Sequence, residues 1–441
     1  MQTGTQENTL LYLNCLRGIA AIYVMVGHAR WLLWEGYNSG FLKHPEDYTY
    51  FDKLLVYFFS LFIYEHQAVI FFFVLSGFVI HLGHSYKLSG NANAAFDYRN
   101  YLFRRFRRIY PPLLFALLIT FLLDSMGSYF QYSIYFQGTP NPSINKYLEF
   151  SPSWKELLGN LLLVNQTYVK SWGTNSPLWS LKYEWWFYMV YPLFLYLNRR
   201  SIAGAAVSVF VLSLFFLSGG YFPVKLISDV LAAMFLWWLG AILADIYTGR
   251  IKLNKKYFLL GWITVPCAFI FRKEIPESFF DTIYAIGFFE LLLTLIIIRE
   301  YHQASLSLLD RMNFIGDFSY TLYVIHFPVL VFMSGYILKK SGNIMPQHFG
   351  YLFLGVVLCI MLAYLLHFLV EKPFVKMAKK EIIPPENEIH GLLQLESENL
   401  EVYKLSGEQK NTGNEVRRQI RNGQFLTNGD ANKDIDEWLS K

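Results

Sequence analysis

Leu13-Asn-Cys-Leu-Arg-Gly-Ile-Ala-Ala-Ile-Tyr-Val-Met-Val-Gly-His28 is the stretch that decides the fold, because it begins the first apolar run and yet carries Arg17 and His28. At about 100° per residue, the two residues are roughly three helical turns apart, so both side chains lie on one face, about 16 Å apart along the axis. Alone, each fits a structural role, with Arg17 extending to the membrane surface and His28 bonded to a neighbouring helix. Together on one stripe, they favour a functional site within a membrane span.

The composition is typical of a polytopic membrane protein. Of its 441 residues, 54% are hydrophobic, 19% aromatic and only 16% charged, which excludes a soluble globular protein. The lipid bilayer is therefore an expected partner, and nucleic acid is not. Cys15, Cys267 and Cys359 lie far apart in apolar stretches, which argues against a disulfide framework or a thiolate metal site. The first ten residues contain no basic cluster or cleavage site, so the first span is expected to be retained.

Apolar runs separated by polar breaks predict an all-α protein with about ten transmembrane helices. An even number of spans places both termini on one side of the membrane. The loops on that side carry most of the Lys and Arg residues, which identifies it as the cytoplasmic side. Arg17 then lies near the cytoplasm and His28 in the outer half. The predicted spans are residues 13–34, 66–82, 109–124, 177–197, 202–218, 226–246, 257–271, 280–298, 318–338 and 349–370.

Two domains are predicted, a transmembrane domain over residues 1–380 and a polar tail over residues 381–441. The tail is rich in Glu, Asn, Lys and Gln. Such a segment buries too little apolar surface to offset its ordering entropy, so a disordered cytoplasmic extension is expected. The outer segment 125–176 is rich in Tyr, Ser, Asn and Pro, and a short amphipathic helix is predicted within it near residues 154–163.

Arg104-Arg-Phe-Arg-Arg-Ile-Tyr-Pro-Pro112 ends the most basic loop with Arg104, Arg105, Arg107 and Arg108. The simplest interpretation is a strong positive-inside signal. The functional interpretation is a guanidinium cluster at the cytoplasmic mouth of the bundle, which binds the phosphates of a nucleotide-containing donor through paired, charged hydrogen bonds. The sequence contains no Gly-rich phosphate loop, so side chains would have to hold the nucleotide.

Phe71-Phe-Phe-Val-Leu-Ser-Gly-Phe78 places Ser76 and Gly77 within an aromatic span. Gly77 is expected to permit close packing of two helices. Ser76 is a candidate hydrogen-bond donor to a substrate. No nucleophile elbow surrounds it, so a covalent acyl-serine is not predicted.

Ser176-Pro-Leu-Trp-Ser-Leu-Lys-Tyr-Glu-Trp-Trp-Phe-Tyr188 carries Glu184 about two turns from the outer end of its span. By residue count, Glu184 and His28 share a depth of roughly 10 Å, which predicts an acid/base pair. Ser180 lies one turn before Glu184 on the same face and is a further candidate for substrate binding. The alternative is a structural ion pair of Glu184, for instance with Lys182.

Asp317-Phe-Ser-Tyr-Thr-Leu-Tyr-Val-Ile-His326-Phe-Pro328 contains a second mid-span histidine, just before a proline that would kink the helix. His326 is a candidate site residue, with pairing inside the bundle as the alternative. Glu290, a further mid-span charge, is expected to be paired. His81 and His84 have no carboxylate or Cys partner nearby in the sequence, so no metal site is predicted.

Five of these motifs, in this order, resemble the membrane-bound acyltransferase 3 family over roughly residues 8–380. Each motif is weak alone, but the series is specific. Two features depart from the family pattern: Asn14 stands where Asp is frequent, and the C-terminal SGNH-hydrolase domain of some members is missing. The matching elements are the Arg-x10-His opening (13–28), the aromatic Ser-Gly-Phe segment (72–78), the Arg-rich Ile-Tyr-Pro stretch (104–112), the Trp-Ser-Leu-x-x-Glu-x-x-Phe-Tyr element (179–188) and the Ser-Tyr-x-Leu-Tyr-x-x-His-x-Pro element (319–328).

The resemblance implies a ten-span O-acyltransferase, by default in a bacterial inner membrane. It implies transfer of an acyl group, commonly acetyl, from cytoplasmic acyl-coenzyme A to a sugar hydroxyl of an envelope or exported glycan. The coenzyme is then a donor substrate and not a permanently bound cofactor. The acyl group, the acceptor and the oligomeric state stay open.

The residues suit this chemistry. A sugar hydroxyl is a poor nucleophile, so a base must take its proton, and neutral imidazole does this near pH 7. We expect His28 to be the base, Glu184 to orient it or the acceptor, and Arg17, Ser76 or His326 to donate to the developing oxyanion. The arginines from Arg104 to Arg108 are expected to hold the phosphates of coenzyme A.

A transporter or flippase of sugars or lipid-linked glycans is the alternative, because intramembrane Arg, His and Glu also form proton relays. The spans do not form two similar halves, and the arginine cluster faces the side of the coenzyme, which favours the enzyme. A polysaccharide polymerase or ligase would need long outer loops with charged catalytic clusters, and the segment 125–176 has few such residues.

Overall fold

The computed structural model describes residues 2–91, 95–136, 138–139, 141–148, 150–252, 279–301 and 306–374. The chain divides into two units, Met1–Ala378 and Lys379–Lys441, and the described residues all belong to the first. The predicted span at 257–271, Cys267 and the predicted tail at 381–441 lie outside the described residues. The expectations for them, including the domain boundary at residue 380, stay predictions.

The described part of the chain is built from helices and contains no β-strand, which confirms the predicted all-α class. Within it, seven segments are long and apolar enough to cross a membrane, so the chain is a polytopic membrane protein. Cys15 and Cys359 are buried free thiols that pack among apolar residues. The seven segments are Leu11–Phe41, Tyr50–Gly90, Tyr98–Tyr129, Lys225–Tyr247, Phe280–Arg299, Ser319–Lys340 and Gly350–Phe374.

Every predicted span that lies within the described residues coincides with a helix. Two of these helices are not among the seven apolar segments. α8 is only 16 residues long, and α7 carries Lys182 and Glu184 in one half and two arginines in its last turn. The helices are α1 (Gln2–Leu32), α3 (Glu65–Gly90), α4 (Tyr98–Tyr129), α7 (Trp179–Arg200), α8 (Ile202–Leu217), α9 (Lys225–Tyr247), α11 (Phe280–Tyr301), α14 (Ser319–Lys340) and α15 (Gly350–Val370).

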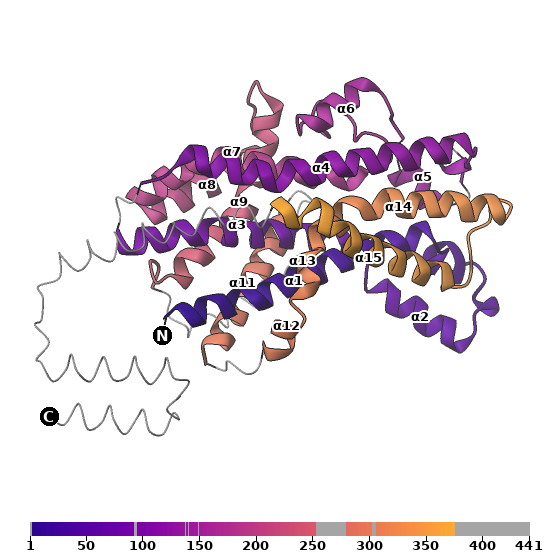
Figure 1. Ribbon diagram of the computed structural model, residues 1–441, viewed down its shortest axis with the longest axis horizontal. Coiled ribbons are helices and arrows are strands. Elements are labelled where there is room, and N and C mark those ends of the chain that lie inside the picture. Colours follow the sequence, from indigo (N-terminus) through magenta and orange to yellow (C-terminus); the bar gives the residue numbers. More distant parts are fainter. Residues whose placement is uncertain are drawn as a thin grey trace, which may run out of the picture. The chain divides into compact units, whose positions relative to one another are not determined.

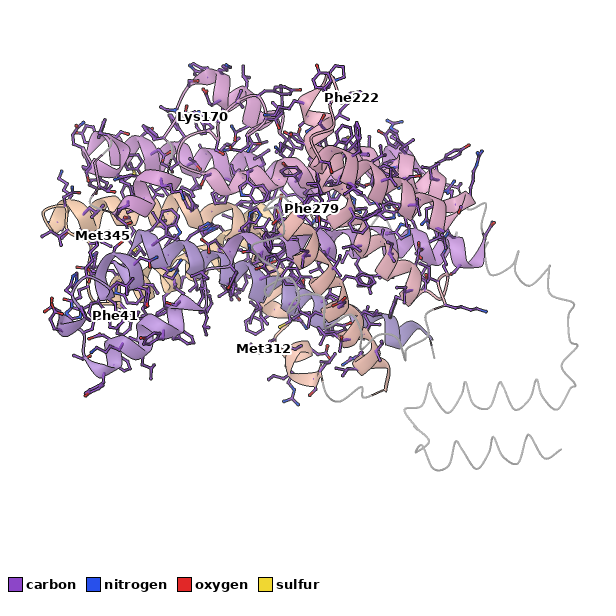
Figure 2. The ribbon with its side chains drawn as sticks, turned by 180° about the vertical axis from the view of Figure 1, so that it is seen from behind. Phe41, Lys170, Phe222, Phe279, Met312 and Met345 are labelled. Carbon is purple, nitrogen blue, oxygen red and sulfur yellow. The ribbon has the colours of Figure 1, made fainter. Side chains whose placement is uncertain are left out.

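Helix α14 is enclosed by other helices along most of its length. Figure 1 shows it in orange alongside α4, and it also packs against α1 and α15. Every residue from Thr321 to Val331 is buried. Helix α3 packs against α1, α9 and α11, and side chains fill the spaces between the helices (Figure 2). Residues on the inward stripes of α1 and α14 are therefore enclosed by other helices.

The four arginines had been predicted to end a loop. In the structure they lie on helix α4. α4 begins at Tyr98, where the Asp97 side chain accepts a hydrogen bond from the backbone N–H of Asn100 at 3.0 Å, and it continues through Pro111 and Pro112. Hydropathy marks only where a helix leaves the membrane. Arginine is a good helix former, so α4 extends beyond its apolar span.

The predicted amphipathic helix near residues 154–163 is confirmed as α6 (Trp154–Leu161). A second one, α2 (Tyr50–Ser60), was missed although Thr49 and Asp52 form a capping box at its start. Its apolar run is too short for a span, so hydropathy along the chain does not indicate it. Three shorter helices connect the longer ones: α5 (Pro142–Tyr147), α12 (Ser307–Arg311) and α13 (Phe314–Asp317).

Gly77 lets α3 and α9 touch through their backbones. A Cβ at Gly77 would lie 3.0 Å from the carbonyl carbon of Trp237 and would collide with its oxygen. A Cβ at Gly240 would collide with the carbonyl oxygen of Val74. This pair of glycines confirms the packing role predicted for Gly77, since small residues allow helices to approach closely in a membrane.

We expect Gly77→Ala to destabilise the protein by about 1–3 kcal/mol, because the added methyl group forces α3 away from α9. Gly83→Ala on the same helix is the matched control. Gly83 is exposed and a Cβ there meets no atom, so this change should be neutral or stabilise by up to about 1 kcal/mol. Thermal unfolding of the purified variants in detergent measures both. Equal unfolding temperatures would contradict the close contact.

Candidate active site

Two histidines separated by 298 residues form a pair between α1 and α14. His28 Nδ1 lies 2.8 Å from His326 Nε2, and the two rings stack at an interplanar angle of 9°. His326 is fully buried, whereas His28 is half-buried. The rings of Trp31 and Phe327 stand edge-on to that of His28. Both histidines were predicted as site residues, but their contact was not.

The local structure of α14 orients His326. Its Nδ1 faces the backbone carbonyl oxygens of the residues three and four positions earlier, at 2.8 and 3.1 Å. Pro328 has no N–H, so the carbonyl of Val324 has no partner within the helix. Asn175 Nδ2 donates to this oxygen at 3.0 Å. The proline thus frees a carbonyl that ties α14 to the segment preceding α7 and holds the helix around His326.

Arg17 is bonded inside the bundle and does not extend to the membrane surface. Its Nε donates to Ser319 Oγ at 2.9 Å, and its Nη2 donates to the carbonyl oxygen of Gly316 at 2.6 Å. Here α1 approaches α13 closely, since a Cβ at Gly18 or at Gly316 would overlap the opposite helix. This close approach brings the guanidinium of Arg17 to the first turn of α14.

Glu184 and His28 form no direct hydrogen bond, and each has other partners, so the predicted acid/base pair is not a direct contact. The Glu184 carboxylate accepts hydrogen bonds from the hydroxyl of Tyr188 and, at 3.5 Å, from Ser76 Oγ. It also lies within electrostatic range of Arg17. The prediction compared depths by residue count, which does not specify the direction in which each helix presents its side chain.

Two other polar residues of α7 have separate partners. Lys182 Nζ donates to Thr167 Oγ1 at 3.0 Å, so Lys182 is not the partner of Glu184. Ser180 is buried, and its Oγ lies 2.6 Å from the hydroxyl of Tyr323. Ser180 therefore links α7 to α14 and forms no hydrogen bond with Glu184.

Two of the four predicted arginines turn toward the interior of the bundle. The guanidinium of Arg105 lies over the rings of Tyr101 and Tyr188, 5.6 Å from each ring centre, and both tyrosines are buried. Arg108, one turn further along α4, lies 5.4 Å over the ring of Tyr320. Stacking on aromatic rings holds each guanidinium plane while leaving its N–H edges available.

The other two arginines, Arg104 and Arg107, have different surroundings. Arg107 lies over the ring of Phe103, and its Nη2 donates to the carbonyl oxygen of Phe374 at 3.4 Å. Arg104 is half-buried on the same helix. Arg108 also forms an ion pair with a buried carboxylate, at 3.8 Å from Glu371. The four positions predicted as one cluster are therefore not equivalent.

The arginines and Glu184 form one polar centre and the histidines another. Tyr323 lies between them, with its ring centre 5.9 Å from that of His326 and its hydroxyl within electrostatic range of Glu184. Along α1 the two centres are about 16 Å apart, so a molecule reaching both must be extended. We call His28 and His326 the histidine pair, and we call the following the arginine–glutamate cluster: Arg17, Arg105, Arg108, Glu184, Tyr188 and Tyr320.

Most side chains of these two centres keep part of their surface accessible, as Arg17, His28, Arg108 and Glu184 are each half-buried. Tyr188 and Tyr320 were not predicted as site residues. Both lie within the motifs quoted above, but a tyrosine in an aromatic-rich span carries no signal of its own, because it resembles any other packing residue. Glu371 was missed because it lies beyond the last predicted span.

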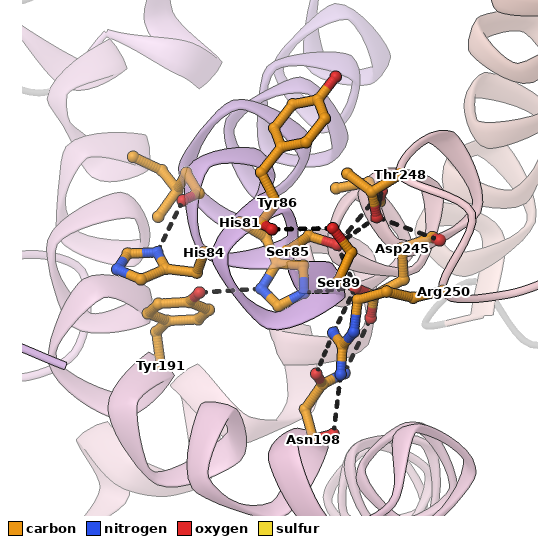
Figure 3. A network of polar contacts seen from close by, with 12 residues as sticks. His81, His84, Ser85, Tyr86, Ser89, Tyr191, Asn198, Asp245, Thr248 and Arg250 are labelled. Atoms are coloured by element: carbon orange, nitrogen blue, oxygen red, sulfur yellow. Dashed lines mark hydrogen bonds and ion pairs between the residues drawn. The ribbon is translucent and has the colours of Figure 1, made fainter. Parts of the chain in front are cut away.

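A third polar centre lies near the ends of α3, α7 and α9 (Figure 3). Asp245 of α9 is completely buried, and its carboxylate binds partners from α3, from α7 and from the loop that follows α9. Because both carboxylate oxygens are bonded, we call this the Asp245 network and regard it as a clamp between helices. The partners of the Asp245 carboxylate are His81 Nε2 at 3.0 Å, Ser85 Oγ at 2.6 Å, Asn198 Nδ2 at 2.9 Å and Arg250 Nη1 at 2.6 Å.

His81 has a carboxylate partner in the structure, although none was expected from the neighbouring sequence. Asp245 is 164 residues away in the sequence and yet contacts the imidazole directly. The other ring nitrogen of His81 lies 2.8 Å from the hydroxyl of Tyr191. Within the described ranges, no group of three or more His, Cys, Asp or Glu side chains is placed to hold a metal ion.

Comparison with known proteins gives one family and two relatives. A family described as "Acyltransferase domain" matches residues 10–368 of the chain. The chain is 26% identical over 68% of its length to "Putative peptidoglycan O-acetyltransferase YrhL" of Bacillus subtilis (strain 168), and it spans about half of that protein, 49%. It is 25% identical over 70% of its length to "Acyltransferase MdmB" of Streptomyces mycarofaciens, of which it covers 81%. No solved structure matches significantly.

We expect Asp245→Asn to destabilise the protein by about 3 kcal/mol, because it removes the charge that compensates Arg250 in a buried network. Glu46→Gln, which neutralises an exposed carboxylate, is the control and should leave stability unchanged. Both are measured as unfolding midpoints in detergent. A loss of activity in Asp245→Asn without a loss of stability would contradict a purely structural network.

Proposed function

Because this chain belongs to the acyltransferase 3 family and is a membrane acyltransferase, we propose that it acylates a hydroxyl group of an envelope or exported carbohydrate. The proposed donor is cytoplasmic acyl-coenzyme A, with acetyl as the acyl group, and the coenzyme acts as a substrate. The name of the Bacillus relative makes peptidoglycan the first acceptor to test. We place the protein in a bacterial inner membrane, with the arginine-rich end of α4 facing the cytoplasm.

The observation that carries this proposal is the histidine pair. A sugar hydroxyl has to lose its proton as it attacks a thioester, and a positioned neutral imidazole is the side chain best suited to accept it near pH 7. His28 retains an accessible surface on one side, while its partner His326 is fully buried. His28 is therefore the member of the pair that a substrate can reach.

The reaction then proceeds in two proton transfers. The acceptor hydroxyl gives its proton to His28 as its oxygen bonds to the carbonyl carbon of the thioester. The carbon–sulfur bond breaks, and the departing sulfur takes the proton from His28. The products are the carbohydrate ester and free coenzyme A, and His28 returns to its neutral form.

The arginine–glutamate cluster supports the binding of the donor. Arg105 and Arg108 carry guanidinium groups that are held by aromatic rings, and such groups form paired hydrogen bonds with phosphate oxygens. The long arm of the donor would extend from there past Tyr323 toward His28. Arg17 and Ser76 remain candidates for stabilising the oxyanion, whereas Nε2 of His326 is already engaged with His28.

We expect His28→Ala to lower the rate of transfer by about 10²–10⁴, because the general base is lost. The measurement is transfer of radiolabelled acetyl from acetyl-coenzyme A to peptidoglycan fragments by the purified protein in lipid vesicles. His348→Ala removes an exposed histidine and should retain full activity. Transfer near the wild-type rate in a folded His28→Ala variant would remove His28 from this role, and uptake of glycan without thioester consumption would favour a transporter.

We expect Arg105→Gln and Arg108→Gln each to raise KM for acetyl-coenzyme A by about tenfold or more, since each loses a charge-assisted hydrogen bond worth about 1.5–3 kcal/mol. Arg107→Gln is the matched control from the same turn of helix, and its KM should change little. Unfolding temperatures of all three exclude a loss of structure. An equal rise in KM for Arg107→Gln would show that the general positive charge, and not the inward pair, holds the donor.

A further inference from the structure

We propose that His326 is a positioning residue that holds His28 in the tautomer with its proton on Nδ1, so that Nε2 carries the free lone pair. The inference deepens the proposed function and rests on it for the catalytic role of that lone pair. It gives His326 a different role from the expected donation to the oxyanion. The tautomer assignment itself follows from hydrogen-bond partners alone.

The assignment begins at the buried end of the pair. Nδ1 of His326 faces two backbone carbonyl oxygens, at 2.8 and 3.1 Å. A carbonyl oxygen can only accept, so Nδ1 of His326 must carry a proton. The carbonyls belong to the helix itself and are held by α14, which is buried throughout this region. The protonated nitrogen of His326 is therefore set by the backbone.

The second step concerns the other nitrogen of His326. The side chain is completely buried, and among the described residues no carboxylate forms a hydrogen bond with either histidine. An unpaired imidazolium in such a place is costly, so His326 is neutral. With its proton on Nδ1, Nε2 is an acceptor. It lies 2.8 Å from His28 Nδ1, which must then be the donor.

His28 is thus left with a proton on Nδ1 and a lone pair on Nε2. The edge-on rings of Trp31 and Phe327 restrict rotation of the His28 ring. When Nε2 takes the proton of the acceptor, the Nδ1–H group still donates to His326, and the new positive charge is shared along the chain of hydrogen bonds to the carbonyls. A neutral imidazole thereby performs the orienting role that a carboxylate performs in the serine hydrolase triad.

Matched substitutions of His326 separate this role from simple packing. Glutamine places its amide oxygen near the former Nε2 position and can accept the proton of His28 Nδ1, whereas the shorter asparagine ends near the former Nδ1 position and cannot. We expect His326→Gln to keep kcat within about tenfold of wild type and His326→Asn to lose about 10²–10⁴ in kcat, as expected for the wrong tautomer. KM for acetyl-coenzyme A should be unchanged in both. Equal kcat values in the two folded variants would overturn the proposal.

A measurement without turnover decides the tautomer directly. In protein labelled with ¹⁵N-histidine and reconstituted in lipid, solid-state NMR should show His28 with a protonated Nδ1 and an unprotonated Nε2. The signals are assigned by their absence in His28→Ala. The His326→Asn variant should lose this preference and His326→Gln should keep it. A protonated Nε2 on wild-type His28 would refute the inference, while failure of wild-type transfer with the expected spectrum would refute only the proposed function.

Discussion

The contact between α1 and α14 is the constraint on which the arrangement of polar groups depends. Lipid offers no hydrogen bonds, so each polar side chain at membrane depth has to find its partner within the protein. Arg17 forms a hydrogen bond with Ser319, and His28 forms one with His326. The packing of α1 against α14 therefore supplies hydrogen-bond partners for both polar residues of the α1 stripe. Glycines at positions 18 and 316 allow the approach at one end of this contact.

The polar groups of the bundle differ in how completely they are buried and hydrogen-bonded. In the Asp245 network a buried carboxylate is bonded on both oxygens and compensated by Arg250, which is the condition under which a buried charge is tolerated. Arg17, His28 and Glu184 keep some accessible surface. The Asp245 network is thus fully enclosed, whereas these three side chains are bonded and still expose part of their surface.

A histidine as the partner of a histidine also has a physical reason. A carboxylate next to His28 would bring a second charge to membrane depth and would need further partners of its own. A neutral imidazole supplies an acceptor for Nδ1 at no such cost. Its own second nitrogen is satisfied by carbonyls of the helix on which it stands, and Pro328 with Asn175 ties that helix in place.

The sequence by itself determined the class of the protein and the position of every span that the structure describes, because apolar content and length along the chain are local properties. It also identified Arg17, His28, Glu184, His326 and the arginines of α4 as unusual, since a polar residue in an apolar run is visible without any neighbour. Only the tertiary structure decided which side chains are in contact: His28 with His326, Glu184 with Tyr188, and His81 with Asp245. Those pairings depend on the rotation and order of packed helices, which residue counts along one chain do not contain.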